Sequence, residues 1–117
     1  MRDDKFLMNE LQTKPKTFDT QEKIMAHPWK LKSIYETGLV PDMAQYKDVE
    51  IVFGPLRIYA IYGNRAERFD YRFVSPRIFT VKINGDTVKC RISKLTDRQL
   101  HFYADYKDGH YLVEMER

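Results

Sequence analysis

Residues 28–35 read Pro-Trp-Lys-Leu-Lys-Ser-Ile-Tyr and contain the only tryptophan of the chain, Trp29. From this point on, apolar and polar side chains alternate with a period of two, which is the pattern of a half-buried β-strand. Trp29, Leu31 and Tyr35 fall on one face of this strand, and the lysines fall on the other. We interpret the segment as the first strand of a small β-barrel and expect Trp29 to seal one end.

A short helix is expected directly before this strand. Asp19 can cap its first turn, and Glu22 three residues later completes a capping box. Pro28 ends the helix, because the residue before a proline avoids the α conformation. Residues 1–18 contain a helix-breaking Lys-Pro-Lys and predict a loosely ordered arm. The sequence therefore predicts one folded domain over residues 19–117, in which the helix braces a sheet.

Short alternating segments, separated by turn signals, follow the first strand to the C-terminus. They cover residues 49–53, 56–62, 68–74, 79–83, 88–92, 100–104 and 111–115. Asn84-Gly85 is the strongest hairpin signal, because a type I′ turn needs positive φ at both positions.

Most connections are too short for parallel strands, so we predict a mostly-β fold, an antiparallel up-and-down meander. Closing about eight strands into a barrel buries the apolar face and removes the edges. If Gly54-Pro55 only bends a single strand, the count is seven.

Composition sets the broad class of the protein. The 117 residues carry a net charge of +3 and include 43% hydrophobic and 14% aromatic residues, which suits one mostly-β domain. No apolar run approaches the roughly 18 residues of a membrane span. A single cysteine, Cys90, fits a reducing compartment, and the N-terminus lacks the apolar core of a signal peptide. We therefore expect a cytoplasmic protein, with a trimmed form of an exported protein as the alternative.

Residue types that carry catalysis are present but are not arranged for it. The three histidines are scattered and have no zinc-ligand spacing with a cysteine. Cys90 alternates inward with Val88 and Ile92, as expected of a small buried residue. The glycines sit at isolated turns rather than in a phosphate-binding loop. The sequence therefore predicts no enzyme, no catalytic residues, no metal and no cofactor.

The predicted barrel interior is one candidate functional region. Its inward positions are rich in large rings, so a filled interior is slightly favoured over a hollow one. A hollow interior would suit a small apolar ligand, bound beneath the apolar connection Gly38–Asp48. The residues expected to line such a site are Trp29, Tyr35, Phe69, Tyr71 and Phe102.

The predicted outer face is the second candidate region. Between Arg57 and Lys94 the chain has nine basic and three acidic residues. Five basic side chains are expected to point outwards on this face: Arg57, Arg68, Arg72, Lys89 and Arg91. Such a face can bind an acidic protein or follow a nucleic-acid backbone, although it lacks the clustered aromatics that stack on bases. Ordinary solubility is the simpler interpretation.

Three features of the chain resemble the lipocalin-like (calycin) group of β-barrels. A short helix precedes a strand that opens with Trp29, where lipocalins have Gly-x-Trp, and a long apolar loop, residues 38–48, follows that strand. Ala104-Asp105-Tyr106, followed by a strand, is similar to the Thr-Asp-Tyr segment of the group. The glycine position is His27 and the threonine position is alanine. Only Arg117 is placed to replace the basic side chain that lipocalins pack on the tryptophan.

The resemblance implies a miniature lipocalin-like barrel, of a kind found in bacteria, with small-ligand binding as its activity. Our first hypothesis is therefore a non-enzymatic barrel that binds a small hydrophobic ligand in its interior. The alternative is a protein-binding or inhibitory module, such as an immunity or regulatory protein, that uses the basic face. Nucleic-acid binding is the third hypothesis, and the oligomeric state is left open.

Overall fold

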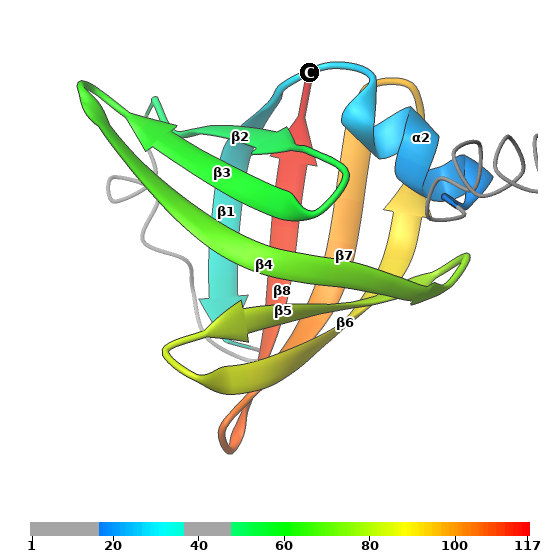
Figure 1. Ribbon diagram of the computed structural model, residues 1–117, viewed down its shortest axis with the longest axis vertical. Helices are drawn as coiled ribbons and strands as arrows, with labels where there is room; N and C mark the ends of the chain where they lie inside the picture. Colours follow the sequence, from blue (N-terminus) through cyan, green and yellow to red (C-terminus); the bar gives the residue numbers. More distant parts are fainter. Residues whose placement is uncertain (1–16, 37–47) are drawn as a thin grey trace, which may run out of the picture.

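A computed structural model of the protein describes residues 17–36 and 48–117, which form a β-barrel preceded by one short helix (Figure 1). The elements are α2 (Asp19–Met25), β1 (Trp29–Glu36), β2 (Glu50–Phe53), β3 (Arg57–Tyr62), β4 (Arg65–Ser75), β5 (Ile78–Ile83), β6 (Asp86–Leu95), β7 (Gln99–Tyr106) and β8 (Gly109–Glu116). Each strand pairs antiparallel with the next one in the chain, and β8 pairs with β1 to close the barrel.

The predicted fold class, an antiparallel up-and-down barrel of eight strands, is confirmed. β2 and β3 lie on either side of Gly54-Pro55 and pair with each other, so they are two strands and the alternative count of seven is wrong. The predicted Asn84-Gly85 hairpin also forms, because both residues have positive φ, 51° and 85°. The loop thus joins β5 to β6 with the backbone geometry that a type I′ turn requires.

Two of the sequence predictions concern residues outside the described ranges. The loose arm was expected over residues 1–18, of which only Thr17 and Phe18 are described. The connection Gly38–Asp48, expected to fold back over the barrel, is described only at Asp48. Within the described ranges, no helix has the length and the apolar character needed to cross a membrane.

The start of α2 differs from its predicted capping signal. Phe18 is the N-cap residue, with extended backbone (φ −78°, ψ 153°), so Asp19 lies inside the first turn and caps nothing. The predicted capping box is therefore wrong, and Glu22 accepts a hydrogen bond from the Thr17 hydroxyl at 2.9 Å instead. Packing is the reason, because the Phe18 ring lies against Phe73 of the barrel, with the ring centroids 6.3 Å apart.

Strand β1 contains a β-bulge that exchanges its two faces. Its pairing with β8 shifts between Leu31 and Ser33, so Lys32 is an extra residue in the strand. Beyond the bulge, Ile34 lines the barrel interior and Tyr35, its neighbour, points outwards. The predicted inward position of Tyr35 is therefore wrong, because strict alternation along a sequence does not reveal an inserted residue.

The barrel interior divides into two parts along its axis. The part next to α2, which we call the closed end, is packed with side chains that are at most 7% exposed. These residues are Ile24, Trp29, Tyr71, Phe73, Ile92 and Leu100. β1 and β2 are bonded to each other only here, through the pairs Trp29–Ile51 and Lys30–Glu50, and they diverge farther from the helix (Figure 1).

Candidate binding cavity

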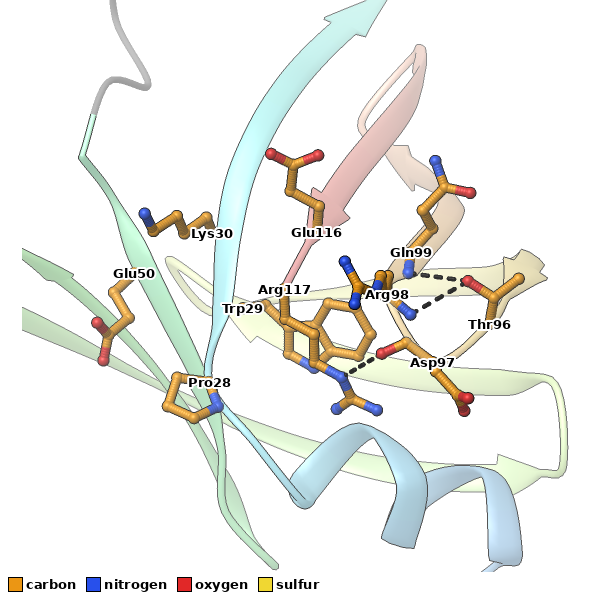
Figure 2. Close-up of a pocket in the computed structure, with 10 residues that line it drawn as sticks. All are labelled: Pro28, Trp29, Lys30, Glu50, Thr96, Asp97, Arg98, Gln99, Glu116 and Arg117. Carbon is orange, nitrogen blue, oxygen red and sulfur yellow. Dashed lines mark hydrogen bonds between the residues drawn. The ribbon is translucent and has the colours of Figure 1, made fainter.

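Trp29 seals the closed end of the barrel, as the sequence predicts. Its side chain is fully buried, and its indole Nε1 donates a hydrogen bond to the Ile24 carbonyl at 2.9 Å. The guanidinium carbon of Arg117 lies 4.1 Å from the centroid of the indole ring, in cation–π contact (Figure 2). Arg117 also donates hydrogen bonds to the carbonyls of Asp97 at 2.8 Å and Lys23 at 2.9 Å. The helix, the β6–β7 turn and residue 117 are thus tied together over Trp29.

A surface groove of about 940 Å³ surrounds this contact on the outside of the barrel (Figure 2). Its central polar groups already have partners within the protein. The Thr96 hydroxyl accepts hydrogen bonds from the backbone N–H groups of Arg98 at 3.3 Å and Gln99 at 3.0 Å, and Arg117 binds two carbonyls. We therefore interpret the groove as part of the closure of the barrel and look for the ligand site in the interior.

Aromatic side chains form a floor across the interior, which we define as Phe53, Tyr71, Phe73 and Phe79. The Phe79 ring is central, with its centroid 5.2 Å from that of Phe73 and 6.3 Å from that of Phe53. The Tyr71 hydroxyl accepts a hydrogen bond from Gln21 Nε2 at 3.2 Å, and burial raises the pKa of this hydroxyl. The floor is the inner boundary of the closed end, to which Tyr71 and Phe73 also belong, and the rest of the interior lies beyond it.

Beyond the aromatic floor, the barrel contains a cavity of about 470 Å³. This volume lies within the range of small-molecule sites, about 300–1,000 Å³. Among the described residues, the lining is aliphatic and aromatic, its polar groups are those of Cys90, Tyr106 and Tyr111, and no lining residue is charged. The expectation of a filled interior is therefore wrong for this half of the barrel, which we call the cavity half.

Small side chains at inward positions create this space. Tyr111, Ala104 and Cys90 lie side by side on one inward row across β8, β7 and β6, and two of the three are small. Ala60 on β3, paired with Ile51 on β2, adds another small side chain to the lining. Of the large rings that predicted a filled interior, Trp29, Tyr71 and Phe73 pack in the closed end and its aromatic floor. Others, such as Phe69, Phe102 and Tyr111, form the wall of the cavity and leave its centre open.

Among the described lining residues, Cys90 alone carries a thiol. It is 2% exposed, and burial, with a smaller contribution from the charge of Asp105, raises the pKa of its thiol to about 12. The thiol is therefore protonated at neutral pH and is a poor nucleophile. Its predicted role as a small buried residue is confirmed.

The predicted ligand-lining residues are distributed over both parts of the interior and beyond it. Phe69 and Phe102 line the cavity. Tyr71 belongs to the floor, and Trp29 lies behind it at the closed end, so neither is among the lining residues. Tyr35 lies on the outer face. The structure therefore brings two of the five residues to the cavity.

Sequence reasoning missed the residues that leave room for a ligand. It searched for large rings, whereas Ala60, Val88 and Ala104 line the cavity. A usable signal was present, because alternation already placed Ala60 and Ala104 on the inward faces of their strands. That Ala60 and Ala104 lie at a similar height along the barrel axis follows only from the strand register, which the sequence does not show.

The predicted basic face lies on the outside of the barrel. All five of its side chains are exposed: Arg57, Arg68, Arg72, Lys89 and Arg91. Within the described part of the chain, only one of them forms an ion pair, Arg57 with Asp70 at 3.2 Å. The Arg91 guanidinium lies over the Tyr103 ring, 5.9 Å from its centroid. The face is thus accessible, and part of its charge is already neutralised.

The fold and the site define a closed antiparallel β-barrel with an uncharged internal cavity. Comparisons with protein-family models, with curated proteins and with solved structures find no match for this chain. Across residues 17–36 and 48–117, no group of three or more histidine, cysteine or acidic side chains is placed to hold a metal ion.

Proposed function

We propose that the protein is a non-enzymatic, lipocalin-like barrel that binds a small apolar molecule in its interior cavity. The observation that carries this proposal is the uncharged cavity of about 470 Å³ within the barrel. A barrel of eight strands has room for one small ligand, and each square ångström of apolar surface removed from water is worth roughly 25 cal/mol.

The closed end supports the lipocalin-like part of the proposal. Trp29 opens the first strand after a short helix, and the Arg117 guanidinium packs on its ring at 4.1 Å. The sequence resemblance implies this pairing of a tryptophan with a late basic residue. Because the closed end is sealed in this way, the cavity half is free to hold a ligand.

Binding of a neutral apolar dye, N-phenyl-1-naphthylamine, tests the proposal. We expect a saturable rise in dye fluorescence with one dye per chain. Trp29 lies behind the aromatic floor and does not line the cavity, so its emission should change through energy transfer to the dye rather than by contact. A linear, non-saturating response would contradict the proposal.

A matched pair of substitutions locates the dye. Ala104→Phe places a ring in the cavity and should abolish saturable binding, because Ala104 lines the space that the dye would occupy. Ala66→Phe is the control, since Ala66 is exposed in β4 and is not a lining residue. Equal dye affinity in the two variants would place the dye elsewhere on the protein.

The basic face is a less supported candidate for function. Its side chains are exposed, but Arg57 is paired with Asp70, and the small pocket of about 220 Å³ beside Lys89 and Arg91 is also lined by the acidic Asp105. An acidic protein partner remains a prediction, and charge reversal at Arg68 and Arg72 tests it. A partner that co-purifies equally well with the reversed variant does not use this face. A nucleic-acid partner would instead bind with an affinity that falls steeply with salt.

A further inference from the structure

We propose that the seam between β4 and β5 is the entrance through which small molecules reach the interior cavity. The proposal rests on the proposed ligand-binding function and names the route to that site. Two observations carry it. The backbone pairing of β4 with β5 ends while both strands continue, and the inward side chains on both sides of the seam become partly exposed beyond that point.

β4 and β5 separate on the side of the barrel that holds the cavity. Their backbone pairing ends at Tyr71–Val81, and within the described part of the chain no pair joins the first half of β4, Arg65–Asp70, to β5. β5 itself continues to Ile83. The two strands lie close together near the turn that joins them and diverge towards the other end of β5 (Figure 1). The seam is therefore closed beside the aromatic floor and open beyond it.

The two neighbouring seams stay paired along the cavity. β3 pairs with β4 up to Tyr62–Arg65, and β5 pairs with β6 up to Ile83–Asp86, so both ladders reach the turns that join the strands. Opening either seam would break backbone hydrogen bonds between strands. Along the open part of the β4–β5 seam there are no such bonds to break among the described residues, so this seam widens most easily.

The exposure of the inward side chains changes at the same boundary. On β4, Tyr71 is 5% exposed and the next inward residue, Phe69, is partly exposed. On β5, Val81 is 7% exposed and the next inward residue, Ile83, is partly exposed. β4 extends beyond Phe69 to Arg65, so the exposure of Phe69 is not that of a strand end.

The two partly exposed residues also belong to the cavity. Phe69 and Ile83 both line it, one on each side of the open seam. A side chain that contacts both the cavity and water marks a place where the two meet. Because both flanking side chains are apolar, a small apolar molecule that passes between them keeps apolar surface out of water along the way.

A chemical bridge across the seam tests the proposal. Asp70→Cys with Lys82→Cys places thiols at the exposed positions that follow the last pair of β4 and β5, and bismaleimidoethane links them. The control is Lys82→Cys with Thr87→Cys, which carries the same linker on the paired seam between β5 and β6. Each bridged protein is compared with the same variant capped with N-ethylmaleimide. Mass spectrometry confirms the bridge, and circular dichroism confirms the fold.

Cys90 reports access to the cavity, because it lines the space and needs no ligand to do so. We expect the β4–β5 bridge to lower the rate at which methyl methanethiosulfonate modifies Cys90 by about tenfold or more, and the control bridge to change it by less than about twofold. Equal rates in the two bridged proteins would overturn the entrance.

The association rate of N-phenyl-1-naphthylamine should fall in parallel in a stopped-flow measurement. If the dye binds at an unchanged rate, the entrance is wrong and the ligand site stands. If the dye does not bind at all, the proposed function fails, and the rate of Cys90 modification still decides whether the seam admits small molecules.

A matched pair of truncations tests the entrance without a linker. Ile83→Ala widens the open seam, so we expect faster modification of Cys90. Ile34→Ala is the control, because Ile34 is also a partly exposed lining residue but lies on β1, away from the seam. An equal increase in both variants would show that cavity size rather than the β4–β5 seam sets the rate, and would contradict the proposal.

Discussion

The closed end and the cavity half are built by the same strands, yet one is packed with rings and the other is hollow. β6 shows the contrast within three inward positions, since Ile92 packs at the closed end while Cys90 and Val88 line the cavity. A barrel that seals one end with Trp29 and Arg117 has a source of stability that does not depend on filling the other end. The comparison therefore assigns stability to the closed end, and it is the cavity half in which we propose that a ligand binds.

Removing the tryptophan should have the largest effect on stability. Trp29→Ala deletes a fully buried ring, its hydrogen bond to Ile24 and its contact with Arg117, so we expect a loss of about 3–5 kcal/mol in the free energy of unfolding. Urea denaturation followed by circular dichroism measures it, because the variant has no tryptophan emission. A change below about 1 kcal/mol would mean that the closed end does not hold the barrel together.

The arginine at the closed end should have a smaller effect. Arg117→Met retains an unbranched apolar chain over the Trp29 ring but removes the cation–π contact and the hydrogen bonds to two carbonyls. We therefore expect the free energy of unfolding to fall by about 1–2 kcal/mol. The control is Arg68→Met on the exposed outer face, which should change stability by less than about 0.5 kcal/mol. If the two substitutions change the free energy of unfolding equally in the same urea titration, Arg117 does not stabilise the closed end.

Enlarging side chains should distinguish the two parts of the interior directly. Ala104→Phe extends into empty space, so we expect it to change the free energy of unfolding by less than about 1 kcal/mol, whereas Ile92→Phe overpacks the closed end and should cost about 1–3 kcal/mol. Thermal or urea unfolding of both variants measures the difference. A larger loss for Ala104→Phe would show that the cavity half is filled in solution.

The rate at which a small reagent modifies the Cys90 thiol should report on the surroundings of this one residue, without a change in the stability of the fold. Only the thiolate reacts, and burial raises the pKa of the Cys90 thiol to about 12. The rate with methyl methanethiosulfonate should therefore rise about tenfold per pH unit between pH 7 and 10 without levelling off. In urea the exposed thiol should level off above its ordinary pKa of about 8.5. Levelling near pH 9 in the folded protein as well would place Cys90 in water rather than in the cavity lining.

The fold was predictable from the sequence because its signals are local. Alternation along each strand and the Asn84-Gly85 turn predict the eight-stranded meander, and a lone tryptophan at the start of the first strand predicts the sealed end. The helix cap was mispredicted at Asp19, because the tertiary contact of Phe18 with Phe73 decides where the helix begins.

The candidate site was only partly predictable because it depends on register. Tyr35 was misplaced because the extra residue Lys32 is visible only when β1 is paired with β8. The hollow interior was missed because the level of a side chain along the barrel axis depends on how the strands are staggered. Phe69 and Phe102 were assigned correctly to the cavity lining because alternation alone settles which face of a strand is buried.

A crystal structure determined under xenon pressure tests the central contrast most directly, because xenon enters apolar cavities that are dry and large enough for it. The account predicts xenon density beyond the aromatic floor, beside Val88, Cys90 and Ala104, and none around Trp29 at the closed end. An interior without xenon and with side chains filling the space beside Ala104, or xenon bound next to Trp29, would contradict it.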